Sequence, residues 1–134
     1  MTAKQFLNKA RAIDLQIDSL EETKHELRDQ LLNTTQNYDS DSVQGQKDPH
    51  KFDALVIVED QINELINQLL IAKKEALGVI FQIQDWRLRE VLKRRYVDMK
   101  SFEQIAASLN YSWRNIMKLH KRGLMEVDKI INGQ

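Results

Sequence analysis

Apolar residues recur along the first third of the chain at alternating spacings of four and three residues. The two interleaved series are Phe6, Ile13, Leu20, Leu27 and Ala10, Ile17, Lys24, Leu31. This alternation is typical of a coiled-coil seam, and it predicts one long helix over Lys4–Leu32. Lys24 is the polar member of the seam. A lysine in the seam can fix the register of the paired helices or the number of helices that associate. Alternatively, it is an irregularity at the edge of a small core.

A second seam predicts another long helix, over Lys51 to about Leu77. All its positions are apolar: Leu55, Val58, Ile62, Leu65, Leu69, Ala72, Ala76 and Val79. A further apolar stripe consists of Ile66, Leu70 and Leu77. A helix that is apolar on two sides must be covered on two sides. We expect the first helix to cover the seam, and either a second chain or the C-terminal part to cover the stripe.

Two segments interrupt these patterns and divide the chain. Asn33–His50 is rich in Asn, Ser, Asp and Gln and contains Gly45 and Pro49, so it predicts a long connection between the two helices. The second helix should loosen between Gly78 and Gln84. We therefore predict an all-α fold in two parts. Residues 1–80 form a coiled-coil-like helical hairpin for oligomerisation or partner binding, and residues 81–134 form a second helical unit.

The second part carries a start signal for each of its helices. Asp85 can cap a helix that continues to Tyr96. Ser101, followed three residues later by Gln104, forms a capping box for the next helix. Asn110 tolerates the left-handed backbone that a tight turn needs. Ser112 can cap the last helix, in which Val127, Ile130 and Ile131 continue the helical spacing toward the C-terminus.

The last helix divides into an apolar and a basic face. Ile116, Leu119 and Gly123 share the apolar face, with His120 at its edge as a packing or phosphate-facing residue. A helix that reads bases in the DNA major groove needs such a division. The residues that we expect to contact DNA are Ser112, Trp113, Arg114, Asn115, Lys118, Lys121 and Arg122. We therefore predict that residues 81–134 form a DNA-binding helix-turn-helix unit. The alternative interpretation is a solvated basic face on an ordinary helical hairpin.

These residues resemble region 4 of bacterial sigma factors, which reads an upstream promoter element. That region has a helix ending in Arg-Tyr, then S-x-E-x-I-A-x-x-L, a turn and S-x-x-x-I. Here the corresponding runs are LREVLKRRY, SFEQIAASL and NYSWRNIMKLHKRGL, within Leu88–Leu124. Asn110 stands where sigma factors usually carry glycine. The last run is also similar to small phage regulators of late transcription of the RinA, ArpU and LtrC kind.

Charge is distributed unevenly along the chain although its formal net value is zero. Residues 1–84 contain 9 Lys/Arg and 14 Asp/Glu, whereas residues 85–134 contain 11 Lys/Arg and 6 Asp/Glu. A basic C-terminal part is typical of a nucleic-acid binder. Cysteine is absent and the three histidines are scattered, so we expect no disulfide, metal site or cofactor. No spacing indicates a catalytic site, and we expect no enzyme.

Two hypotheses for function follow. The first is a sequence-specific regulator of transcription that binds double-stranded promoter DNA as a homo-oligomer, most simply a dimer. The resemblance implies a phage or prophage activator of late genes that contacts host RNA polymerase in the bacterial cytoplasm. The second is a helical protein–protein interaction module that does not bind DNA. No signal peptide is recognisable, and the longest apolar run is far shorter than the roughly 18 residues of a membrane span, so we expect no membrane association.

Overall fold

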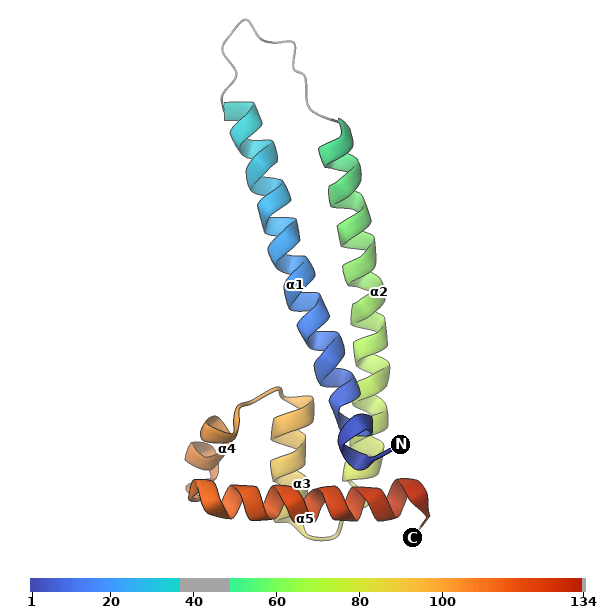
Figure 1. Cartoon of the computed structure of the whole chain (residues 1–134), viewed down its shortest axis with the longest axis vertical. Helices are drawn as coiled ribbons and strands as arrows, with labels where there is room; N and C mark the ends of the chain where they lie inside the picture. Colours follow the sequence, from blue (N-terminus) through green and yellow to red (C-terminus); the bar gives the residue numbers. More distant parts are fainter. Residues whose placement is uncertain (37–48, 134) are drawn as a thin grey trace, which may run out of the picture. The chain divides into compact units, whose positions relative to one another are not determined.

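The computed structural model describes residues 1–36 and 49–133, and the regular elements in this part of the chain are all helical. They are α1 (Ala3–Gln36), α2 (Pro49–Ile80), α3 (Trp86–Leu92), the π-helical η1 (Lys93–Val97), α4 (Phe102–Leu109) and α5 (Trp113–Asn132) (Figure 1). This confirms the predicted all-α fold, a long N-terminal helix pair followed by a helix-turn-helix. The predicted connection falls mainly on residues 37–48, which lie outside the described residues.

The chain forms two compact units, one of residues 1–13 with 69–134 and one of residues 14–68. We call the first the composite unit and the second the middle unit. The composite unit contains the start of α1 and the end of α2 together with α3, η1, α4 and α5. The predicted assignment of roles, partner binding to residues 1–80 and DNA binding to residues 81–134, stays a prediction.

In the middle unit, α1 and α2 pair through the predicted seam. Ile62 and Leu65 are buried there. The ammonium of Lys24 lies 3.6 Å from Oε1 of Glu59, and Nη2 of Arg28 lies 3.2 Å from the same oxygen. Lys24 thus has its carboxylate partner on the facing helix of the same chain. This contact favours the interpretation in which Lys24 fixes the register, here that of α1 against α2.

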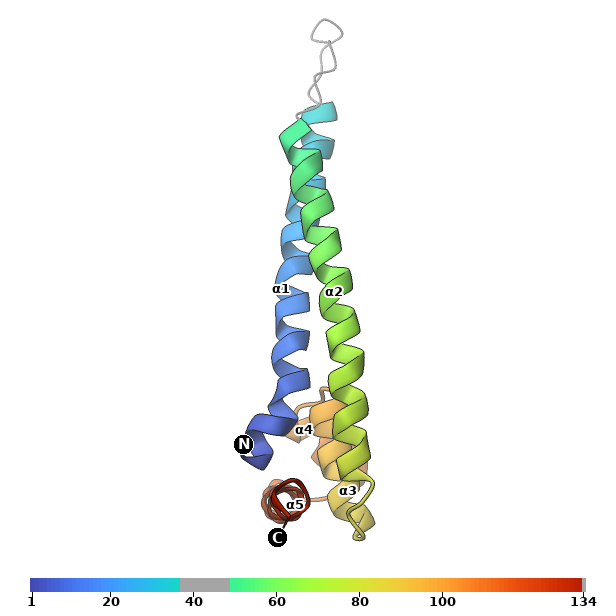
Figure 2. The same ribbon diagram turned by 90° about the vertical axis from the view of Figure 1, so that its right-hand side faces the viewer.

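In the composite unit, the first turns of α1 belong to the main hydrophobic core. Leu7 is fully buried, whereas Phe6, the residue predicted for the seam, is only half-buried. The buried face of α1 is rotated here because this turn packs into a cluster that also contains residues of α3 and α5. The backbone N–H of Ala3 donates to Oδ1 of Asp128 at 2.7 Å and joins α1 to α5. Figure 2 shows the start of α1 beside α5.

The helix that begins after Asp85 continues past Tyr96, as predicted, but its last turn is π-helical rather than α-helical. Asp85 caps it by accepting from the backbone N–H of Arg87, as expected. However, α3 ends at Leu92, and the chain continues in the wider π-helical turn η1. This turn buries Tyr96, and Met99 then adopts a left-handed backbone with φ of 59°. A single π-helical turn inside a helix is often found at functional sites.

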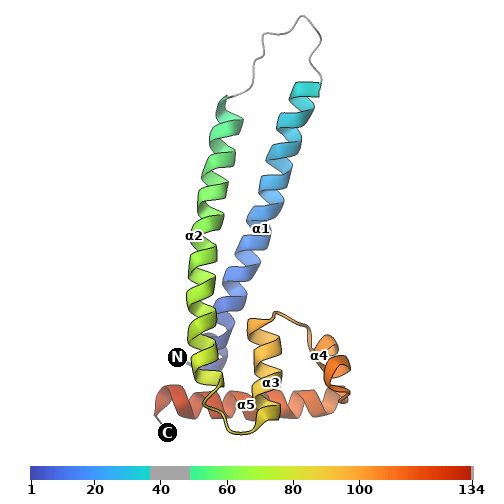
Figure 3. The same ribbon diagram turned by 180° about the vertical axis from the view of Figure 1, so that it is seen from behind.

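The predicted start of α4, the turn at Asn110 and the predicted start of α5 are confirmed. Ser101 and Gln104 form the capping box of α4. Asn110 ends α4 in the left-handed conformation, with φ of 59° and ψ of 42°. The hydroxyl of Ser112 accepts from the backbone N–H of Asn115 and starts α5. These local signals set the bounds of α4 and α5, which Figure 3 shows from behind together with α3.

Two helical glycines provide a test of this packing. A Cβ on Gly123 would lie 3.0 Å from two side-chain carbons of buried Leu92, whereas a Cβ on Gly78 would meet nothing within 4 Å. We expect Gly123→Ala to lower the free energy of unfolding by about 1 kcal/mol, because overpacking outweighs the gain in helix propensity. Gly78→Ala should raise it by about 0.5–1 kcal/mol. Urea denaturation of both variants measures the effects, and a stabilised Gly123→Ala variant would contradict the close packing of α3 on α5.

Candidate nucleic-acid interface

The predicted recognition helix, the N-terminal half of α5, buries one side and exposes the other. Ile116 is fully buried and Leu119 is 2% exposed, and both belong to the composite core. The side chains predicted to contact DNA are all exposed: Ser112, Trp113, Arg114, Asn115, Lys118, Lys121 and Arg122. The structure therefore brings these seven residues together on accessible turns of one helix.

Some of these side chains already have partners within the chain. Ser112 uses its hydroxyl to cap α5. The ring of Trp113 packs edge-on against Phe102 of α4, with centroids 5.9 Å apart. By contrast, Arg114, Lys118 and Lys121 form no ion pair within the described part of the chain. These three cations are available to an external ligand.

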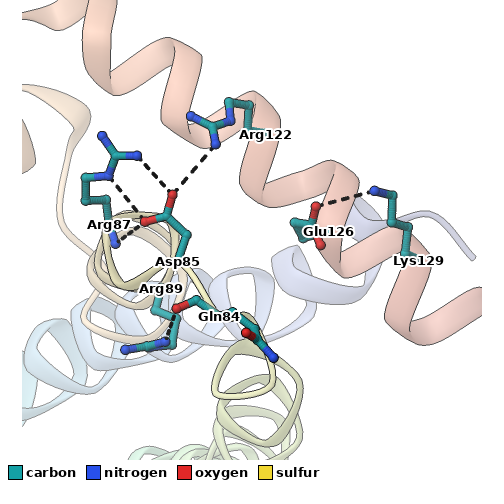
Figure 4. Close-up of polar contacts among 7 residues, drawn as sticks. All are labelled: Gln84, Asp85, Arg87, Arg89, Arg122, Glu126 and Lys129. Atoms are coloured by element: carbon teal, nitrogen blue, oxygen red, sulfur yellow. Dashed lines mark hydrogen bonds and ion pairs between the residues drawn. The ribbon is translucent and has the colours of Figure 1, made fainter.

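Arg122 is held at the flank of this face by a network around Asp85 (Figure 4). Its Nη2 lies 3.7 Å from Oδ2 of Asp85, which also accepts from Nη2 of Arg87 at 3.0 Å. The hydrogen bonds from Arg87 hold the pKa of Asp85 below its usual value, and the positive charge of Arg122 adds to the effect. Asp85 therefore stays ionised and links the start of α3 to α5. Any phosphate bound by Arg122 would compete with this carboxylate.

His120 of α5 packs against Tyr96 of η1 and Phe102 of α4. Its Nε2 lies 2.6 Å from the hydroxyl of Tyr96, and the two rings stack with centroids 5.7 Å apart. Phe102 meets the other side of the imidazole edge-on, at 4.9 Å between centroids. Of the two roles considered for His120, the structure supports packing. Burial lowers the pKa of His120 to about 4, and the positive charges of Arg95 and Lys4 contribute to the decrease.

This pKa makes the stability of the protein dependent on pH. The folded chain keeps His120 neutral down to about pH 4, whereas the unfolded chain protonates it near pH 6.5. The free energy of unfolding should therefore fall as the pH decreases from about 6.5 to 4, by about 1–2 kcal/mol because solvent reaches part of the ring. Thermal unfolding at pH 7.5 and pH 5 measures the change. His120→Gln should reduce the difference, whereas His25→Gln, at an exposed position, should retain it.

The exposed face extends further along α5 than the predicted site. Met125 and Lys129 are exposed and lie on the side of the helix that carries Arg114 and Lys118. The helical spacing that identified Arg114 and Lys118 also places Met125 and Lys129 on this face, but the predicted site ended at Arg122.

Among the described residues, no group of three or more His, Cys, Asp or Glu side chains is arranged to hold a metal ion. No helix in residues 1–36 and 49–133 is long and apolar enough to cross a membrane.

Residues 85–129 match the family model of sigma-70, region 4. This segment, about a third of the chain, covers α3, η1, α4 and most of α5. No curated protein and no solved structure matches the chain. The family is a DNA-binding, non-enzymatic helix-turn-helix family. The match therefore indicates a DNA-binding role like that of transcription regulators.

Proposed function

We propose that the protein is a sequence-specific regulator of transcription that binds promoter DNA through α5. The observation that carries the proposal is the division of this helix. Ile116 and Leu119 anchor one side in the core, while Arg114, Lys118 and Lys121 are exposed on the other and form no ion pair with residues 1–36 or 49–133. Such a helix can enter the major groove, because its cations meet base edges and phosphates while its apolar side stays covered.

Within this proposal, the contacts divide by position along α5. Arg114, Asn115 and Lys118, in the first two turns, contact bases or lie near them. Ser112 and Lys121 contact phosphates. Recognition helices read bases mainly through their N-terminal residues, and flanking polar groups set the register on the duplex.

More specifically, we propose that the protein activates late genes of a phage or prophage. It would do so together with host RNA polymerase, in the bacterial cytoplasm. It is supported by the resemblance of Leu88–Leu124 to sigma region 4 and to phage regulators of late transcription. If it holds, the whole chain immobilised on beads should retain purified bacterial RNA polymerase. Activation in a purified transcription system with no detectable physical contact would argue against this part of the proposal.

The proposal includes a homodimer. The second apolar stripe of α2 is covered only in part, because Leu77 packs on the composite core whereas Ile66 and Leu70 are 40% and 61% exposed. Val56, 54% exposed, continues this side of α2 toward its start. Packing two copies through these sides into a four-helix bundle would cover them. A two-fold symmetric dimer would also present two recognition helices, which suits a repeated half-site.

Selection of DNA from a random pool tests the central claim. The whole chain is incubated with random duplexes, and bound DNA is recovered and sequenced over several rounds. We expect an enriched motif and an affinity that decreases steeply as the salt concentration rises. Recovery of random sequence with no salt dependence would reject DNA binding.

The exposed apolar residues of α2 favour a second candidate, a helical module that binds another protein and no DNA. Retention on heparin and on random duplex DNA separates the two candidates. Retention of the whole chain that falls with salt supports the regulator. Retention no greater than that of an acidic control protein of similar size supports the interaction module.

A further inference from the structure

Two cations of α1, Lys4 and Arg11, and one of η1, Arg95, belong to the composite unit together with α4 and α5. Lys4 and Arg11 lie seven residues apart in α1, and therefore on one face of that helix. Arg95 comes from η1, and its guanidinium carbon lies 4.1 Å from the centroid of the Phe102 ring. Nη1 of Arg95 also donates to the carbonyl of Lys100 at 3.2 Å. The positive charge of Arg11 is close enough to help lower the pKa of Arg95, after burial.

The start of α1 is held firmly in this position. Thr2 and Gln5 form a reciprocal cap, with hydrogen bonds of 2.9 and 3.1 Å. The Ala3 amide donates to Asp128 of α5, and Leu7 is fully buried in the core. Lys4 lies between these anchors, with its side chain exposed. Its position relative to α5 is therefore set by the fold rather than by a flexible tail.

The three cations lack acidic partners. Within the described residues, no carboxylate forms an ion pair with Lys4, Arg11 or Arg95, although the charge of Glu103 acts weakly on Arg95. Like charges held close together repel one another, and an anionic ligand relieves that repulsion. Lys4 and Arg11 are separated by roughly 10 Å along the axis of α1, at 1.5 Å per residue. This spacing suits a row of phosphates better than one small anion.

We propose that Lys4, Arg11 and Arg95 bind backbone phosphates of the duplex that α5 reads. This inference rests on the proposed function and extends the DNA interface to the start of α1. The Ala3 amide beside Lys4 donates to Asp128 of α5, and Asp128 follows Lys121 by seven residues and therefore lies on the side of the helix that carries Arg114 and Lys121. Figure 2 shows this end of α1 alongside α5. The first turns of the N-terminal helix are therefore part of the DNA-binding surface, in addition to supporting the core.

The salt dependence of DNA binding tests this inference. The double variant Lys4→Gln/Arg11→Gln should reduce the magnitude of the slope of log K against log salt by about 2, one for each phosphate contact. At 0.15 M salt its affinity should be about 10- to 30-fold weaker. The loss should be equal on the selected site and on random duplex, because phosphate contacts carry no sequence information. Fluorescence anisotropy at several salt concentrations provides these values.

The control is Lys9→Gln, which removes one positive charge from another side of α1. Lys9 lies there 3.7 Å from Glu75. Its slope should equal that of the wild type. Because Arg11 is half-buried, Lys4→Gln alone is also measured, and its slope should change by about 1. If the folded double variant had the same slope of log K against log salt as the wild type, the inference would be wrong. These cations would then not contact the phosphates of the DNA. Absence of salt-dependent binding by the wild type would instead reject the proposed function.

Discussion

Arg114→Ala should weaken binding to the selected DNA site by about 1–3 kcal/mol, or roughly 5- to 150-fold, and relax the preference at one base pair. Arg114 is exposed in the first turn of α5 and forms no ion pair with the residues that the structure describes. A guanidinium placed there can donate two hydrogen bonds to a guanine edge, and alanine removes both donors. Affinities for the selected site and for each single-base variant of it measure the effect.

Lys121→Ala is the matched comparison for this experiment. Its side chain is exposed two turns further along α5. If Lys121 contacts a phosphate, its loss should weaken binding to all duplexes alike and lower the salt slope by about 1. The two variants therefore separate base reading from backbone binding. If Arg114→Ala changed neither affinity nor preference, α5 would not be the recognition helix.

Leu70→Glu should convert the proposed dimer into a monomer without unfolding the chain. Leu70 is 61% exposed on α2, so a carboxylate there is hydrated in the monomer. In a bundle of two copies the same carboxylate would be buried in an apolar interface, which is strongly unfavourable. Sedimentation equilibrium at tens of micromolar measures the change. DNA affinity should fall at the same time, because two linked contacts become one.

Leu15→Glu provides the control, since Leu15 is 60% exposed on α1 and lies outside the α2 stripe. This variant should sediment as the wild type does. A wild-type chain that is monomeric at tens of micromolar would exclude the dimer. The experiment needs the whole chain, because residues 1–13 and 69–134 form one compact unit that a fragment ending near residue 80 would divide.

The sequence predicted those parts of the fold that depend on neighbouring residues. The caps at Asp85, Ser101 and Ser112 were predicted because each involves a side chain and a backbone amide two or three residues away. The left-handed turn at Asn110 follows from the chemistry of that one residue. The exposed face of α5 follows from the helical period alone.

The missed features depend on contacts between distant segments. The buried position of Leu7 results from packing against α3 and α5, which the seam of the first helix does not reveal. Arg122 was predicted as a DNA contact, and its proximity to Asp85 requires that α3 and α5 pack together. The π-helical turn adds one residue to a turn without changing the apolar pattern enough to be recognised. The grouping of Lys4 with Arg95 is likewise visible only after folding.

The hydrogen bond between Ala3 and Asp128 also constrains when the protein can finish folding during synthesis. Its two residues are 125 positions apart in sequence, so a ribosome adding about 5–20 residues per second needs about 6–25 s to make the second after the first. Throughout that interval Leu7 has no completed core to enter. Contacts among α3, η1 and α4 are closer in sequence and can form earlier. Docking of the N-terminal turn onto α5 is therefore a late step, which cannot occur before Asp128 has been synthesised.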